Sequence, residues 1–199
     1  VIAFLLIFVS NFVFGQNSFN VTSQSVGVSS SFSVEIGLDN TSEVTAFQFD
    51  LSHNESAYEL LSGSTLTSRA ENHSLSVSTV DETTIRVIVF SSSNEVISIG
   101  DGAILNLNFE SNNEPGTYGL SMSDIVLSDQ NGASLGVSST GGSVTILGPR
   151  YDLVTTAVNF GEIPLNSTQQ QNVNVSNTGN EDLIISSYSI DAPFSLIDA

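Results

Sequence analysis

The side chains of this sequence that could do acid–base or metal chemistry are few and lie far apart. The two histidines, His53 and His73, stand in polar, turn-like stretches, which is typical of surface histidines. The chain has no cysteine, so disulfides, thiolate metal sites and cysteine nucleophiles are excluded. A zinc site usually takes about four ligands, which two separated histidines do not supply. The sequence therefore predicts neither a metal site nor a bound cofactor.

Hydroxyl and carboxyl groups are abundant, but no pattern among them indicates catalysis. The many serines include no Gly-x-Ser-x-Gly elbow, the turn that presents a serine nucleophile. No pair among the 21 acidic residues is singled out as the acid and base of glycoside hydrolysis. We therefore expect no catalytic residues and predict that the protein is not an enzyme.

The net charge of the chain limits the classes of partner that it can bind. The 199 residues carry 21 acidic side chains against three arginines, with no lysine, and the formal net charge is −18. Such a field repels phosphate backbones and anionic lipid surfaces, which excludes nucleic acid as a partner. The hydrophobic fraction of 40% and the periodic apolar residues argue for a folded core rather than disorder. The composition suits a secreted or surface-displayed protein.

Two short loops look at first like ligand sites. Ser128–Gly132, "SDQNG", lacks the ligand pattern and the distal glutamate of a calcium loop, so a hairpin turn at Asn-Gly is the better interpretation. Gly100–Gly102, "GDG", has no lysine after it, and the acidic field opposes phosphate. Both stretches are predicted to be tight turns.

The elements that would position any site are short strands. Segments such as "SFSVEIGLDN", "TIRVIVFSS" and "AILNLNFES" alternate apolar and polar residues and are separated by Gly- and Asn-containing turns. In "AFQFDLS", residues 46–52, Phe47, Phe49 and Leu51 should face a core and Gln48 and Asp50 the solvent. The pattern predicts an all-β sandwich or barrel. Only "ESAYELL", residues 55–61, favours a helical turn or two, with Asn54 as its cap.

Both ends differ from this strand-rich body. Residues 1–16 have the apolar run and the small residues of a signal peptide, and the run is too short for a membrane span of about 20 residues. Gly148-Pro149 separates a first unit, residues 17–148, from a second, residues 149–199, where about three or four strands are expected. Since an immunoglobulin-like sandwich needs about 100 residues, the second unit is expected to be the truncated N-terminal part of such a module.

The order of four stretches gives a family resemblance. The "LDN" turn, the "AFQFDLS" strand, "IGDGAILNLNF" and the closing "GGSVTI" together resemble a cohesin domain over about residues 20–147. The resemblance implies a jelly-roll β-sandwich related in fold to certain cellulose-binding modules. It further implies that the chain binds a dockerin-type protein outside the cell, in polysaccharide-degrading or surface-scaffold assembly. Calcium, if involved, is then expected on the dockerin.

The second unit has a resemblance of its own. "VNFGEIPLNSTQQQNVNVSNTGNEDLIIS" and then "APFSL" resemble the first half of the abnormal-spindle/Hydin-like Ig modules of choice-of-anchor surface proteins. Such modules are generally spacers or scaffold parts.

The cohesin resemblance also implies where a partner would bind. Cohesins use a flat sheet face, which would include the strand of residues 46–52 and the later strand "TIRVIVFSSS". The residues expected to line it are Gln48, Asp50, Arg86, Ile88, Ser91 and Ser92.

Two alternatives stay open at the level of sequence. One is direct binding of polysaccharide, which generally uses flat exposed aromatic side chains; the chain has no Trp, and only Tyr58 and Tyr118 lie in the first unit. The other is an adhesive spacer with no specific ligand.

Overall fold

The computed structural model describes residues 16–197, and the predicted signal peptide lies almost entirely outside this range. All regular structure in the described residues is β-strand, and none of it is a helix that could span a membrane. The strands are β1 (Asn17–Val21), β2 (Gln24–Gly27), β3 (Ser31–Asp39), β4 (Ala46–Ser52), β5 (Tyr58–Leu60), β6 (Thr65–Leu66), β7 (Ser74–Asp81), β8 (Thr84–Phe90), β9 (Ala103–Ser111), β10 (Gly116–Ser128), β11 (Val137–Thr140), β12 (Gly142–Leu147), β13 (Tyr151–Leu153) and β14 (Val175–Asn177).

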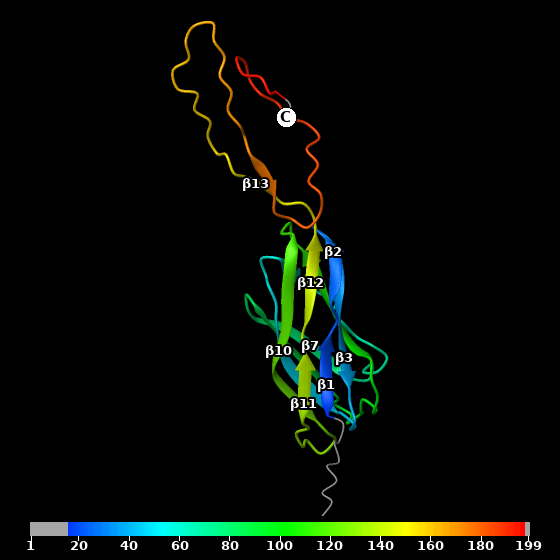
Figure 1. Cartoon of the computed structure of the whole chain (residues 1–199). Coiled ribbons are helices and arrows are strands. Elements are labelled where there is room, and N and C mark those ends of the chain that lie inside the picture. Colours follow the sequence, from blue (N-terminus) through cyan, green and yellow to red (C-terminus); the bar gives the residue numbers. More distant parts are fainter. Residues whose placement is uncertain (1–15, 198–199) are drawn as a thin grey trace, which may run out of the picture.

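Two sheets pack face to face, as predicted for a sandwich (Figure 1). One has the strand order β11-β1-β3-β9-β5, with β6 also paired to β9, and the other has the order β2-β12-β10-β4-β8-β7. The chain crosses from the first sheet to the second between β1 and β2 and again between β11 and β12. As a result, β1 pairs in parallel with β11 in the first sheet, and β2 pairs in parallel with β12 in the second. At this corner a Cβ on Gly141 would overlap with the carbonyl oxygen of Leu120, so glycine is required for the close approach.

The core lies between the sheets and follows the predicted alternation. Phe47, Phe49 and Leu51 of β4 are buried, as are the alternate residues of β8 from Ile85 to Val89. Phe19 of the opposite sheet packs its ring 5.3 Å from that of Phe47 and 5.6 Å from that of Phe49. Burying each such side chain stabilises the fold by about 1.5–3 kcal/mol. With no disulfide available, this core holds the domain together.

Of the helical turn or two predicted at residues 55–61, the structure has a single turn at 55–57 that ends at Tyr58. Asn54 does accept a hydrogen bond from the Ala57 N–H at 3.1 Å, but the chain then enters β5, which pairs with β9. Tyr58 is fully buried, with its ring 5.5 Å from that of Phe109. Pairing with β9 and burial of this aromatic side chain outweigh the local helix preference.

After β12 the chain leaves one end of the sandwich as an extended segment, residues 149–197, which we call the C-terminal arm (Figure 1). The arm holds one two-stranded ribbon, β13–β14, rather than the expected three or four strands, and no Ig-like sandwich is seen in these residues. Leu165 is 92% exposed and Ile184 83%, because no second layer covers them. Two strands alone do not make a stable sandwich.

A turn of the C-terminal arm nevertheless forms hydrogen bonds with the linker, residues 146–150, where the chain leaves β12. The Asn180 side chain accepts a hydrogen bond from the Gly148 N–H at 2.9 Å and donates one to the Ile146 carbonyl at 2.8 Å. The Asn177 carboxamide oxygen accepts the Arg150 N–H at 3.1 Å. Hydrogen bonds with Asn177 and Asn180 thus hold the chain on either side of residue 148, where the boundary was predicted.

Candidate functional site

The outer face of β4 and β8 carries most of the residues expected to meet a partner. Strand register places Asp50 opposite Arg86 and Gln48 opposite Ile88, with all four side chains pointing away from the core. On the flanks, β10 pairs with β4 and β7 pairs with β8. The face therefore spans four adjacent strands, β10-β4-β8-β7, which we call the outer face.

An ion pair joins β4 to β8 on the outer face. The Arg86 Nε–H and Nη2–H groups donate to Oδ1 and Oδ2 of Asp50, both at 2.7 Å. The Asp50 side chain is only 6% exposed and that of Arg86 38%. The hydrogen bonds from Arg86 lower the pKa of Asp50, and the same bonds raise the pKa of Arg86. Two parallel hydrogen bonds between a guanidinium and a carboxylate are strong and fix the geometry of the pair. The Asp50 carboxylate is therefore already bound by a residue of the same chain.

Apolar side chains lie next to the ion pair. Phe90 is 44% exposed and Val126 51%, while Ile88 is partly buried between Gln48 and Ser76. Ser74, Ser76 and Ser78 of β7 form an exposed hydroxyl edge beside them. A small apolar centre with a polar rim is the usual anatomy of a protein–protein interface.

A β-bulge in β10 completes the outer face. The register with β4 shifts between Ser123 and Val126, and the extra residues include Asp124, whose φ angle is 48°. A positive φ is uncommon for a residue with a side chain, although Asp tolerates it better than most. Asp124 is exposed, and its negative charge adds to the effect of Asp50 in raising the pKa of Arg86. The bulge therefore brings a second carboxylate to the ion pair.

Sequence reasoning missed Asp124, Val126 and Phe90. A usable indication was present in "LSMSDIVLS": the inward residues Leu120 and Met122 are two apart, but the next, Ile125, comes three later. A step of three in a strand of period two indicates a bulge.

Ser91 and Ser92 lie beyond the end of β8, which stops at Phe90. Ser91 Oγ accepts the Glu95 N–H at 2.8 Å and so closes the following loop, while Ser92 is exposed. The structure therefore brings together Gln48, Asp50, Arg86 and Ile88, and places the two serines in the loop beside them.

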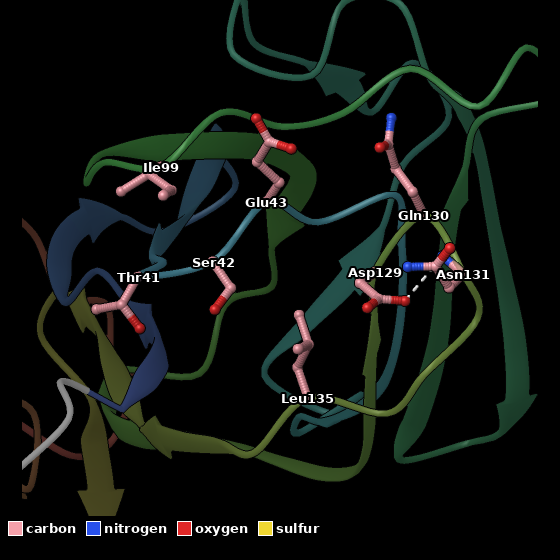
Figure 2. A pocket seen from close by; sticks show the side chains of 8 residues that line it. All are labelled: Thr41, Ser42, Glu43, Ile99, Asp129, Gln130, Asn131 and Leu135. Atoms are coloured by element: carbon pink, nitrogen blue, oxygen red, sulfur yellow. Dashed lines mark hydrogen bonds between the residues drawn. The ribbon is translucent and has the colours of Figure 1, made fainter.

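Two hollows lie away from the outer face. One, of about 470 Å³, opens between loops lined by Glu43, Ile99, Asp129 and Leu135, among others (Figure 2). Asp129 accepts the N–H groups of Asn131 at 2.8 Å and Ala133 at 2.9 Å, which forms the predicted turn. Within residues 16–197 no group of three or more acidic or histidine side chains is placed to hold a metal ion.

The second hollow is bordered by His53, Glu55 and Glu82. His53 is 8% exposed, so its prediction as a surface histidine is wrong. Its ring packs 6.0 Å from that of Tyr58, and burial lowers its pKa. The structure gives it a packing role beside the aromatic core.

The two tyrosines of the first unit are not displayed for stacking. Tyr58 is fully buried, and Tyr118 packs on it with a ring separation of 6.3 Å and donates its hydroxyl to the Glu114 carbonyl. Neither ring offers a flat exposed surface to a sugar.

Comparison with known proteins gives one consistent family. The Cohesin domain model matches residues 18–146. A comparison with curated proteins gives no match.

Solved structures agree with this fold. A complex of CaDoc0917 with CaCohA2, the latter from Clostridium acetobutylicum, matches with a TM-score of 0.60 at 18% identity, over 66% of this chain and 99% of that one. A non-cellulosomal cohesin from the archaeon Archaeoglobus fulgidus gives 0.59 at 19% identity, over 67% and 93%. The Coh-OlpA–Doc918 complex, a type I cohesin–dockerin complex from Clostridium thermocellum, gives 0.61 at 15% identity, over 67% and 100%.

Proposed function

The chain belongs to the cohesin family, and from this premise we propose that it is a non-catalytic docking module that binds a dockerin-type protein through the outer face. The single observation that carries the proposal is the outer face itself: an apolar centre, a partly buried ion pair and a hydroxyl rim on one sheet. Two of the similar solved structures are complexes of a cohesin with a dockerin, which supports a partner of the same kind here.

A capture experiment tests this function. The full chain is incubated with calcium-loaded dockerin modules drawn from the genome that encodes it, each immobilised on beads, with and without EDTA. We expect at least one dockerin to retain the chain in calcium and to release it in EDTA, because the calcium belongs to the dockerin. Retention by none of them would overturn the proposal.

Direct polysaccharide binding is the competing function, and the tyrosine geometry speaks against it. With Tyr58 buried and Tyr118 packed upon it, Phe90 is the exposed aromatic residue of the outer face, and a single ring does not form a stacking strip. Retention of the chain on insoluble cellulose or xylan, with no capture by dockerins, would favour this alternative.

We also propose the setting in which docking takes place. The acidic composition and the apolar N-terminal stretch support export to the cell surface or the medium, and an assembly that degrades polysaccharide fits the cohesin family. The C-terminal arm is proposed to be the start of an Ig-like spacer, supported by the alternating pattern of its sequence. Cell fractionation with an antibody against the chain tests the first point; finding the chain only inside the cell would refute it.

A further inference from the structure

The part of the outer face around the Asp50–Arg86 pair carries one more negative charge than it can neutralise. Arg86 uses two of its donor groups on Asp50, and the charges of this pair cancel. Asp124 adds a second carboxylate beside this pair, because Ser123, the residue before it, lies opposite Asp50, and its charge contributes to raising the pKa of Arg86. Two acids therefore lie near one base.

No other arginine of the chain is placed to neutralise Asp124. The chain has only three arginines and no lysine. Arg69 is held by backbone carbonyls of β3 and the loop before β9, including Leu38 at 2.6 Å and Gly100 at 2.9 Å. Arg150 pairs with Glu114 at 3.0 Å, at the start of the C-terminal arm. A cationic side chain that meets Asp124 has to come from another molecule.

The fold holds Asp124 in this position. The bulge shifts the register between Ser123 and Val126, so Asp124 leaves the ordinary alternation while Ser123 stays opposite Asp50. The apolar residues Met122 and Ile125 on either side are packed against the core, which anchors the bulge. The carboxylate is thus presented at the edge of the Asp50–Arg86 pair by a strand of the sheet, rather than by a loop.

Apolar side chains adjoin this charge on the outer face. Val126 lies two residues beyond Asp124 and opposite Gln48, and Ile88 lies on the far side of Gln48. Phe90 extends the apolar surface along β8. A surface complementary to this one has apolar side chains with a positive charge at one end. The net charge of −18 would also steer a basic partner toward the domain.

We propose that the partner places a lysine or arginine side chain against Asp124 and aliphatic side chains over Val126, Ile88 and Phe90. The inference rests on the proposed docking function and names the chemistry that the partner must supply. Asp124 then acts as a specificity-determining residue, and the Asp50–Arg86 pair as its positioning support.

The test compares two isosteric changes that each remove one negative charge. Asp124→Asn removes the charge at the bulge and keeps a residue type that tolerates positive φ. Glu35→Gln is the matched control, since Glu35 is exposed on β3 of the opposite sheet. Binding of the full chain to a captured dockerin is measured by biolayer interferometry at several salt concentrations, and melting temperatures confirm that both variants fold.

We expect Asp124→Asn to weaken binding about tenfold, mainly through slower association, and to flatten the dependence of affinity on salt. Asp124→Lys should weaken it further, and Glu35→Gln should stay within about twofold of the unaltered chain. If Asp124→Asn and Glu35→Gln behave alike, the inference is wrong while docking stands. If the unaltered chain binds no dockerin, the docking function itself falls, and the inference falls with it. A mutant cycle against each basic residue of the captured dockerin then identifies the cation, and no coupling with any of them would also overturn the inference.

Discussion

Asp50 on β4 and Arg86 on β8 face each other across one strand pairing and are joined by two hydrogen bonds of 2.7 Å. A carboxylate that sequence reasoning places in direct contact with a partner is thereby occupied from within the chain. If the outer face docks a partner as proposed, Asp50 acts through Arg86, whose position it fixes.

The first prediction concerns this pair. Asp50→Asn keeps the shape of the side chain but removes the charge that holds Arg86, so we expect docking to weaken about tenfold with the sandwich intact. Asp50→Arg should do more harm, since it puts two guanidinium groups side by side in a site that is closed to water on the Asp50 side, and it should lower the melting temperature as well. Titration calorimetry and thermal unfolding measure the two effects. Unchanged affinity for Asp50→Asn would show that the Asp50–Arg86 pair does not contribute to docking.

The second prediction concerns Arg69, which serves the fold. Its guanidinium donates to the Leu38 and Gly102 carbonyls, to the Asn40 side chain at 2.6 Å and to two further carbonyls of the loop before β9. Arg69→Met removes these charge-assisted hydrogen bonds at once, although the Gly100 and Gly102 carbonyls keep backbone donors, and should cost about 2–4 kcal/mol of unfolding free energy in urea. Arg150→Met is the control, because its exposed ion pair with Glu114 should cost less than about 1 kcal/mol. Equal losses for both variants would contradict this role.

The third prediction is a pH dependence. Burial lowers the pKa of both His53 and His73 from the ordinary value of 6.5, so the folded chain prefers the neutral rings. Below pH 6.5 the unfolded chain takes up protons that the folded chain does not, and the free energy of unfolding must fall. Stability from these residues is therefore present above pH 6.5 and is lost progressively as the pH falls below that value.

The carboxylates act in a separate, lower window. The lowered pKa values of Asp50 and Asp129 contribute stability above their ordinary value of 3.8, which is lost as the pH falls below it. Urea unfolding at about pH 7.5 and about pH 5 isolates the histidines. The double variant with His53→Phe and His73→Leu should flatten the change between these two values, and a change as steep as that of the unaltered chain would contradict the assignment.

The fourth prediction concerns the hydrogen bonds between the C-terminal arm and the linker. A Cβ at Gly179 would overlap with the carbonyl oxygen of Gly148 and the backbone nitrogen of Arg150. Gly179→Val should therefore push the turn off the linker and break the hydrogen bonds of Asn177 and Asn180. Limited proteolysis should then cleave near residue 150 several times faster, with the sandwich left intact. Gly161→Asn is the control, since Gly161 lies in an open part of the arm and Asn tolerates its positive φ of 63°; equal cleavage of the two variants would contradict the close packing.

Much of the outer face follows from sequence, and the reasons for the rest are physical. Alternation in residues 46–52 is strict, so the outward direction of Gln48 and Asp50 was predictable and agrees with the burial of Phe47, Phe49 and Leu51. The expectation that Asp50 faces the solvent is wrong, because its carboxylate is held by Arg86 and the residue is only 4% exposed. The pairing of Asp50 with Arg86 was not predictable, because register between strands that are distant in sequence depends on the whole sheet.

The other wrong predictions came from local sequence preferences at positions where contacts with distant residues determine the structure. The stretch around Tyr58 favours a helix locally, yet pairing with β9 makes it a strand. The polar surroundings of His53 in the sequence hide that its ring reaches the aromatic core. In the arm, alternating residues predicted strands, but strands need partners, and only β13 and β14 find each other within the described residues.

The most direct test of the central claim is the affinity of the full chain for a captured dockerin after the apolar centre of the outer face is disrupted by Val126→Glu. Val126 is half exposed, so the fold should tolerate the change, and the melting temperature should hold. If docking uses this face, the dissociation constant should rise at least about a hundredfold, because a desolvated carboxylate would replace an apolar contact. Binding that survives Val126→Glu unchanged would show that the partner docks elsewhere.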